Sequence, residues 1–253
     1  MEIESWLVFI AAIFVGSYVQ SVIGFAMGMI VVAIGGLTAS VAFTTLTAAV
    51  SLITLVNIIM ALRGNLRFVS RRFLFYLVLG QLPAIAAGLY VLDHLTADAL
   101  SVLELLLALF LVCGSLAMVY RPNPIVKISG PVALFFAGMA AGITGGLFAA
   151  SGPVMGWFAY RQPLELKIIR ATLLSFFAVA CISRTLMVAY GGGITEEVIR
   201  LFLASIPAVV LGAWLGVMTK PNVADALLKR VVFIAILVMG VYIGIRAAYQ
   251  FTH

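Results

Sequence analysis

Residues 20–28 read Gln-Ser-Val-Ile-Gly-Phe-Ala-Met-Gly, and residues 142–153 read Gly-Ile-Thr-Gly-Gly-Leu-Phe-Ala-Ala-Ser-Gly-Pro. Glycine and proline in the middle of a membrane-length apolar stretch interrupt a helix where lipid supplies no replacement hydrogen bonds. Such a break persists only when it is buried in protein or lines a polar cavity. Broken helices at corresponding positions of two halves are the sequence feature that points to a transporter's substrate site. The two stretches therefore predict a small membrane transporter.

The composition is that of an integral membrane protein. Of 253 residues, 64% are hydrophobic and only 9% are charged, and the mean hydropathy is +1.23. A soluble domain of this length could not cover its core with so little polar surface. Each of about eight apolar segments is long enough to cross ~30 Å of hydrocarbon. We therefore expect an all-α, multi-pass protein of the cell inner (cytoplasmic) membrane, in contact with membrane lipid, with segments at Trp6–Gly36, Ser40–Leu62, Phe73–Leu92, Ala99–Tyr120, Pro131–Tyr160, Ile168–Tyr190, Val198–Met218 and Ala224–Ala248.

Two short matches indicate that the chain is a duplicated four-segment unit. The pattern Pro-Ala-x-x-x-Gly occurs at Pro83–Gly88 and again at Pro207–Gly212. The sequence Ala-Asp-Ala-Leu occurs once after each of these, in the same order in both halves. We expect a single compact membrane domain made of two repeats, residues 1–122 and 123–253, joined where two prolines exclude a helix.

The charged connections predict how the repeats are oriented. Four arginines lie within residues 63–72, which places that connection in the cytoplasm by the positive-inside rule. If eight segments simply alternated, the basic residues of 161–170 would lie outside and the acidic pair at 196–197 inside, against the rule. The conflict disappears if the second glycine-rich stretch enters and leaves on one side. We therefore expect inverted repeats, with glycine-broken or re-entrant helices at Trp6–Gly36 and Pro131–Tyr160.

Several function classes are excluded by what the chain lacks. The net charge of +6 is spread over short connections, so we expect no nucleic-acid partner. Cys113 and Cys181 lie mid-segment without metal-ligand spacing, and we interpret both as buried free thiols. There is no P-loop, and neither His94 nor His253 has partners at a catalytic spacing. We expect no catalytic residue, no metal and no cofactor, so the chain is predicted not to be an enzyme.

The two glycine-rich stretches resemble those of a known family. Gly24-Phe-Ala-Met-Gly28, preceded by Gln20, is similar to the first glycine motif of the TauE/SafE sulfite-exporter family, also called the toluenesulfonate uptake permease family, and residues 142–153 are similar to its second. Length, segment number and duplication also fit over essentially the whole chain. The resemblance would lead us to expect a glycine at Ala26, a proline near Ala33 and often a glycine at position 144. It implies movement of sulfite, sulfonates or related small organic anions across the bacterial cytoplasmic membrane.

The residues themselves also favour an anionic substrate. Consecutive glycines let backbone N–H groups point into one concavity, and a helix N-terminus adds partial positive charge. An oxyanion suits such a cradle because its oxygens accept from several amides at once. The alternative is close helix packing, because small residues at intervals of four also let backbones approach. Gly24-x-x-x-Gly28 and Gly138-x-x-x-Gly142 fit that alternative.

Arg184 is the first candidate for contact with the substrate outside the glycine-rich stretches. A guanidinium within a span costs at least ~2.5 kcal/mol, so it normally faces a cavity or a partner. Its fork can bind two oxygens of a sulfonate or carboxylate, although it could instead snorkel to the membrane surface. Asn57, Gln81 and Gln20 are further cavity candidates. The predicted substrate-binding set is Gln20, Gly24, Phe25, Gly28, Asn57, Gln81, Gly142, Thr144, Gly145, Gly146, Ser151 and Arg184.

The leading hypothesis is a secondary transporter for a small sulfur-containing or organic anion, with its site between the two glycine-broken segments. A passive anion channel with the same cradle is the alternative within transport. A non-transporting integral-membrane enzyme or subunit is the alternative from another class, against which stands the lack of clustered nucleophiles, bases or ligands. No acidic residue lies near the middle of a segment, so coupling to protons is not indicated. Direction of transport and homo-oligomerisation are left open.

Overall fold

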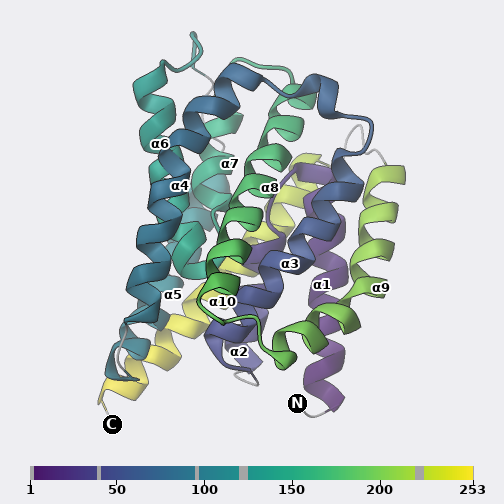
Figure 1. Ribbon diagram of the computed structural model, residues 1–253. Coiled ribbons are helices and arrows are strands. Elements are labelled where there is room, and N and C mark those ends of the chain that lie inside the picture. Colours follow the sequence, from purple (N-terminus) through teal and green to yellow (C-terminus); the bar gives the residue numbers. More distant parts are fainter. Residues whose placement is uncertain (1–2, 39–40, 95–96, 120–124, 220–224, 253) are drawn as a thin grey trace.

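The computed structural model describes residues 3–38, 41–94, 97–119, 125–219 and 225–252 (Figure 1). All regular structure within these ranges is helical, which confirms the all-α prediction. Eight of the described helices are long and apolar enough to cross a membrane, so the chain is a multi-pass membrane protein. The elements are α1 (Ile3–Ile23), α2 (Met27–Thr38), α3 (Phe43–Leu62), the short 3₁₀ helix η1 (Leu66–Phe68), α4 (Arg71–Asp93), α5 (Ala97–Val119), α6 (Pro131–Phe148), α7 (Gly152–Tyr160), α8 (Leu166–Tyr190), α9 (Glu196–Met218) and α10 (Asp225–Thr252).

Two of the apolar segments expected from the sequence are each divided into a helical hairpin, α1–α2 and α6–α7. The entrance of α6 lies beside the exit of α7, because Ser129 N donates to Gln162 Oε1 at 3.0 Å and Ile125 N donates to Arg161 O at 2.8 Å. In Figure 1 this end of the α6–α7 hairpin is at the top, whereas the N-terminus and α2 lie at the bottom. The two hairpins therefore enter the bundle from opposite ends.

The connections rich in basic residues gather at the end of the bundle where α6 begins and α7 ends. Lys167 Nζ lies 5.9 Å from the ring centre of Phe68, and Arg67 Cζ lies 4.9 Å from the same ring. Ser70 N donates to Thr172 Oγ1 at 3.0 Å, which joins the start of α4 to α8. Simple alternation of eight spans is therefore wrong, because it separates these connections. The placement is the one that inverted repeats require, and the duplication itself stays a prediction.

The two halves interlock through helix pairs lined with small residues. Helix α6 packs on α4 and α1 packs on α9, so each hairpin's first helix packs against the other half. A Cβ at Gly142 would lie 2.6 Å from Gln81 O of α4. On the other side, a Cβ at Gly212 of α9 would lie 2.5 Å from Phe14 O of α1. Only glycine permits such close backbone approach, and this packing holds both hairpins in the bundle.

Candidate functional site

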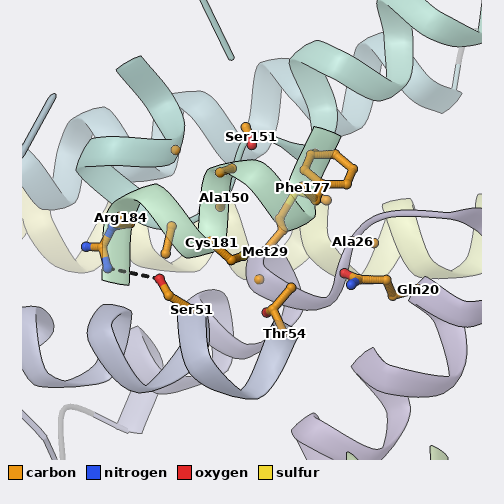
Figure 2. A pocket seen from close by; sticks show the side chains of 15 residues that line it. Gln20, Ala26, Met29, Ser51, Thr54, Ala150, Ser151, Phe177, Cys181 and Arg184 are labelled. Atoms are coloured by element: carbon orange, nitrogen blue, oxygen red, sulfur yellow. Dashed lines mark hydrogen bonds between the residues drawn. The ribbon is translucent and has the colours of Figure 1, made fainter. Parts of the chain in front are cut away.

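A cavity lies where the two hairpins turn, between them and helices α3 and α8 (Figure 2). It leaves ≈ 40 Å³ for the centres of water-sized groups, enough for roughly three waters. We call it the inner cavity. Its walls come from α1, α2, α3, α6, α7, α8 and the breaks within both hairpins. Its lining residues are Gln20, Ala26, Gly28, Met29, Ser51, Thr54, Gly145, Ala149, Ala150, Ser151, Gly152, Phe177, Ala180, Cys181 and Arg184.

Left-handed backbone at both breaks turns the chain toward the inner cavity. Gly24 has φ +88°, Ala26 has φ 101° and Ala149 has φ 52°. A side chain at φ near 100° is strained, so Ala26 occupies a position that favours glycine, as the family resemblance leads one to expect. The two turns also touch, because a Cβ at Gly28 would collide with Ala149 O.

Two helix N-termini meet at the inner cavity. Helix α2 begins at Met27 and α7 begins at Gly152. The first N–H groups of a helix have no acceptor inside it, and the aligned peptide dipoles make this end partly positive. Met27 N donates to Gln20 Oε1 at 3.2 Å, whereas Gly28 and Met29, the next residues of α2, line the inner cavity. Both N-termini thus favour a negatively charged occupant.

Two polar side chains of the inner cavity have uncommitted hydrogen-bonding atoms. Gln20 Nε2 and Thr54 Oγ1 are buried and have no hydrogen-bond partner among the described residues. Figure 2 shows the Gln20 amide directed toward the other lining side chains, and Thr54 lies on the wall that α3 contributes. An unsatisfied buried donor costs ~1–3 kcal/mol, so an occupant that accepts hydrogen bonds is stabilised here.

Arg184 is buried inside the bundle, with a side chain that is only 3% exposed. Its Nη1 donates to Thr47 O at 2.8 Å and Ser51 Oγ at 3.1 Å, and its Nη2 donates to Thr47 Oγ1 at 2.9 Å. Its Nε donates to Gly146 O at 3.3 Å. The guanidinium therefore joins α8 to α3 and α6 and does not snorkel. All four acceptors are neutral, and among the described residues lining the inner cavity no other is charged.

The structure brings five of the predicted site residues to the inner cavity: Gln20, Gly28, Gly145, Ser151 and Arg184. The other seven lie elsewhere, and the glycines show why. Helix α6 continues through Gly142, Gly145 and Gly146 and ends only at Phe148. Gly142 and Gly146 face α4, where they permit close packing, and Gly145 between them faces Ser151.

The remaining predicted residues have structural surroundings of other kinds. Asn57 joins α3 to α1 by donating to Ser17 O, Ser17 Oγ and Ser21 Oγ at 2.7–3.0 Å. Gln81 is fully buried in α4 but does not line the inner cavity. The others are Gly24, which lies against the backbone of Arg170; Phe25, which stacks on Phe233 at 5.8 Å; and Thr144, whose Oγ1 donates to Ala141 O at 3.1 Å.

Sequence reasoning missed the contribution of α3 to the inner cavity. Ser51 and Thr54 line it, and Thr47 lies one turn before Ser51. The intervals of four and three residues place these three hydroxyls on one face of an apolar helix. This polar stripe was the available signal.

Comparison with known proteins gives one consistent result. Residues 8–243 match the family model described as sulfite exporter TauE/SafE. The chain is 34% identical, over 92% of its own length and 89% of the relative's, to a protein of Cupriavidus necator named probable sulfite/organosulfonate exporter TauE. No solved structure matches. The family is one of exporters and not of enzymes. The chain belongs to the TauE/SafE sulfite exporter family.

Proposed function

We propose that this protein is a secondary transporter that moves a small sulfur oxyanion, such as sulfite or a short sulfonate, across the bacterial cytoplasmic membrane. The end that carries Arg67 and Lys167 is the cytoplasmic end by the positive-inside rule. The substrate occupies the inner cavity. The name of the Cupriavidus necator relative supports this substrate class. We further propose that residues 1–122 and 123–253 are inverted repeats, each of which contributes one hairpin to the site.

One observation carries the assignment of the site: donors without acceptors converge on a buried cavity that has no acidic lining residue among those described. In the proposed complex, Gln20 Nε2, Thr54 Oγ1 and Ser151 Oγ donate to the oxygens of the anion. The N-termini of α2 and α7 add partial positive charge, about +0.5 each. Arg184 supplies the full positive charge. Such an arrangement binds a tetrahedral or pyramidal oxyanion and disfavours cations.

The charge of the site favours a monoanion over a dianion. The inner cavity has one guanidinium, which is the only full positive charge among its described lining residues and is neutralised by a monoanion. The helix N-termini offer partial charges through their N–H groups, which compensate the second charge of a buried dianion less completely than a second guanidinium would. Sulfonates carry a single negative charge. We therefore expect methanesulfonate to compete better than sulfate at equal concentration.

The test is uptake of radiolabelled methanesulfonate and sulfite into proteoliposomes, in competition with sulfate, thiosulfate and acetate. Saturable uptake that sulfonates inhibit and acetate does not would support the proposal. Absence of any anion-dependent flux would contradict it. Counterflow decides between a carrier and the alternative of a passive channel, because only a carrier accumulates labelled substrate when unlabelled substrate is supplied on the other side.

A further inference from the structure

A second cavity, the outer cavity, lies at the end of the bundle opposite the basic connections. It leaves ≈ 200 Å³ for water-sized groups and is lined by residues from the start of α3, the ends of α4 and α8, and the connection that follows α8. These include Thr44, Thr45, Asp93 and Val188. Arg184 lines this cavity as well as the inner cavity.

The order of residues along α3 and α8 places one polar layer between the two cavities. On α3, Thr44 and Thr45 line the outer cavity, and Ser51 and Thr54 line the inner one. On α8 the order is reversed because the helix runs the other way, with Cys181 at the inner cavity and Val188 at the outer one. Between them lie Thr47 and Arg184, joined by hydrogen bonds of 2.8 and 2.9 Å.

We propose that Arg184, Thr47 and Ser51 form the barrier that closes the inner cavity toward the outer end, and that the transported anion opens it. The oxygens that hold the guanidinium belong to neutral groups of α3 and α6. An oxyanion in the inner cavity offers charged acceptors to the same N–H groups, and charge-assisted hydrogen bonds are about twice as strong as neutral ones. Arg184 then exchanges Thr47 and Ser51 for the anion, and α8 is released from α3.

The barrier has a further charge on its outer side. Asp93 lines the outer cavity together with Arg184, and its carboxylate attracts the guanidinium once the hydrogen bonds to α3 are broken. Among the described residues that line the two cavities, the other titratable group is Cys181, on the inner side. Thr47 and Ser51 act here as positioning residues for Arg184. The inference rests on the proposed function, because it names the anion as the trigger.

Cys181 makes the barrier testable, because it lines the inner cavity in the natural sequence. In a Cys113→Ser background, Cys181 is the single thiol. The probe is a membrane-impermeant cationic methanethiosulfonate added from the outer end, with methanesulfonate as the anion. The orientation of the protein in the proteoliposomes is measured with two further variants, which lack both natural cysteines and carry either Tyr190→Cys or Val126→Cys. Both positions are exposed; residue 190 lies at the outer end and residue 126 at the basic end.

We expect slow labelling of Cys181 in the parent and at least tenfold faster labelling when methanesulfonate is present. The Thr47→Val/Ser51→Ala variant loses both hydroxyl acceptors of Arg184 and keeps the two backbone carbonyls; it should label faster than the parent without any anion. Thr47→Ser alone, which keeps a hydroxyl at position 47, should label as slowly as the parent. Ser205→Ala is the matched control, since its hydroxyl is also buried but donates to Leu201 O within α9; it should label like the parent.

Two results would overturn the barrier. One is equal labelling of the parent and the Thr47→Val/Ser51→Ala variant without anion. The other is an anion that leaves labelling unchanged or slows it, as a ligand that merely fills the cavity would do. Methanesulfonate uptake is measured on the same vesicles. A parent that takes up no anion contradicts the proposed function, whereas normal uptake with unchanged labelling contradicts the barrier alone.

Discussion

Gly145 and Gly146 are adjacent in α6 but are expected to respond to alanine in opposite ways. A Cβ at Gly146 would lie 2.6 Å from Ile85 O, 3.0 Å from Gly88 Cα and 3.1 Å from Leu89 N. All three are backbone atoms of α4 that cannot rotate away. Overpacking costs ~1–3 kcal/mol, and replacing a helical glycine with alanine returns ~0.5–1 kcal/mol. We expect Gly146→Ala to lose about 1 kcal/mol of stability.

A Cβ at Gly145 meets only ordinary contacts, 3.5 Å from Ser151 Oγ and 3.6 Å from Ser151 Cβ. Gly145→Ala should therefore be as stable as the parent or slightly more stable. Its methyl group projects into a cavity of ≈ 40 Å³, where it displaces the anion from at least one donor. Loss of one hydrogen bond to a charged group costs ~1.5–3 kcal/mol, so KM for uptake should rise roughly tenfold or more.

The assay is thermal unfolding in detergent together with methanesulfonate uptake for both variants, normalised to inserted protein. Gly146→Ala should lower the melting temperature, with little change in KM for the protein that remains folded. Gly145→Ala should raise KM and keep the melting temperature. If the two variants behave alike, or if Gly145→Ala transports normally, the assignment of one glycine to packing and the other to the site is refuted.

Three further predictions follow from the inner cavity. Arg184→Gln should weaken the apparent affinity for the anion roughly ten- to a hundredfold, and Arg184→Lys should retain it only in part. The concentration dependence of uptake measures both effects, and full activity of both variants would exclude a contact between Arg184 and the anion. Ala26→Gly should raise stability by about 1 kcal/mol, because glycine relieves the strain at φ 101°, and an unchanged melting temperature would contradict that strain. Thr54→Val removes an unpartnered hydroxyl, so direct binding of methanesulfonate should weaken while thermal stability is kept; a loss of stability without loss of binding would show a structural hydroxyl.

The broken helices could be predicted from the sequence because lipid imposes a strong penalty on unpaired backbone. The position of the second break could not. Gly142, Gly145 and Gly146 lie before the break, within α6, where Gly142 and Gly146 permit contact with α4. Gly152 lies after the break and begins α7. The non-helical residues 149–151 contain no glycine at all. A glycine that serves packing and one that serves a cavity look the same in a sequence, since the difference lies in which neighbour the missing side chain would meet.

The sequence predicted those site residues whose side chains are energetically costly to place within a membrane. Arg184 stood out because a buried guanidinium requires compensation, although its four acceptors on α3 and α6 could not be foreseen. Ser51 and Thr54 gave no such signal in the sequence, because a hydroxyl can bond within its own helix. Asn57 looked like an equal candidate until the structure placed its amide against Ser17 and Ser21.

The most direct test of the proposed site is the position of the anion itself. Selenite is the selenium analogue of sulfite, and its anomalous scattering identifies it without ambiguity in a crystal of the complex. The proposed site predicts one selenium peak in the inner cavity, within hydrogen-bonding reach of Gln20 Nε2 and Ser151 Oγ and next to Arg184. A peak only at the basic end, among residues such as Arg72, or no ordered selenium at saturating concentration, would contradict it.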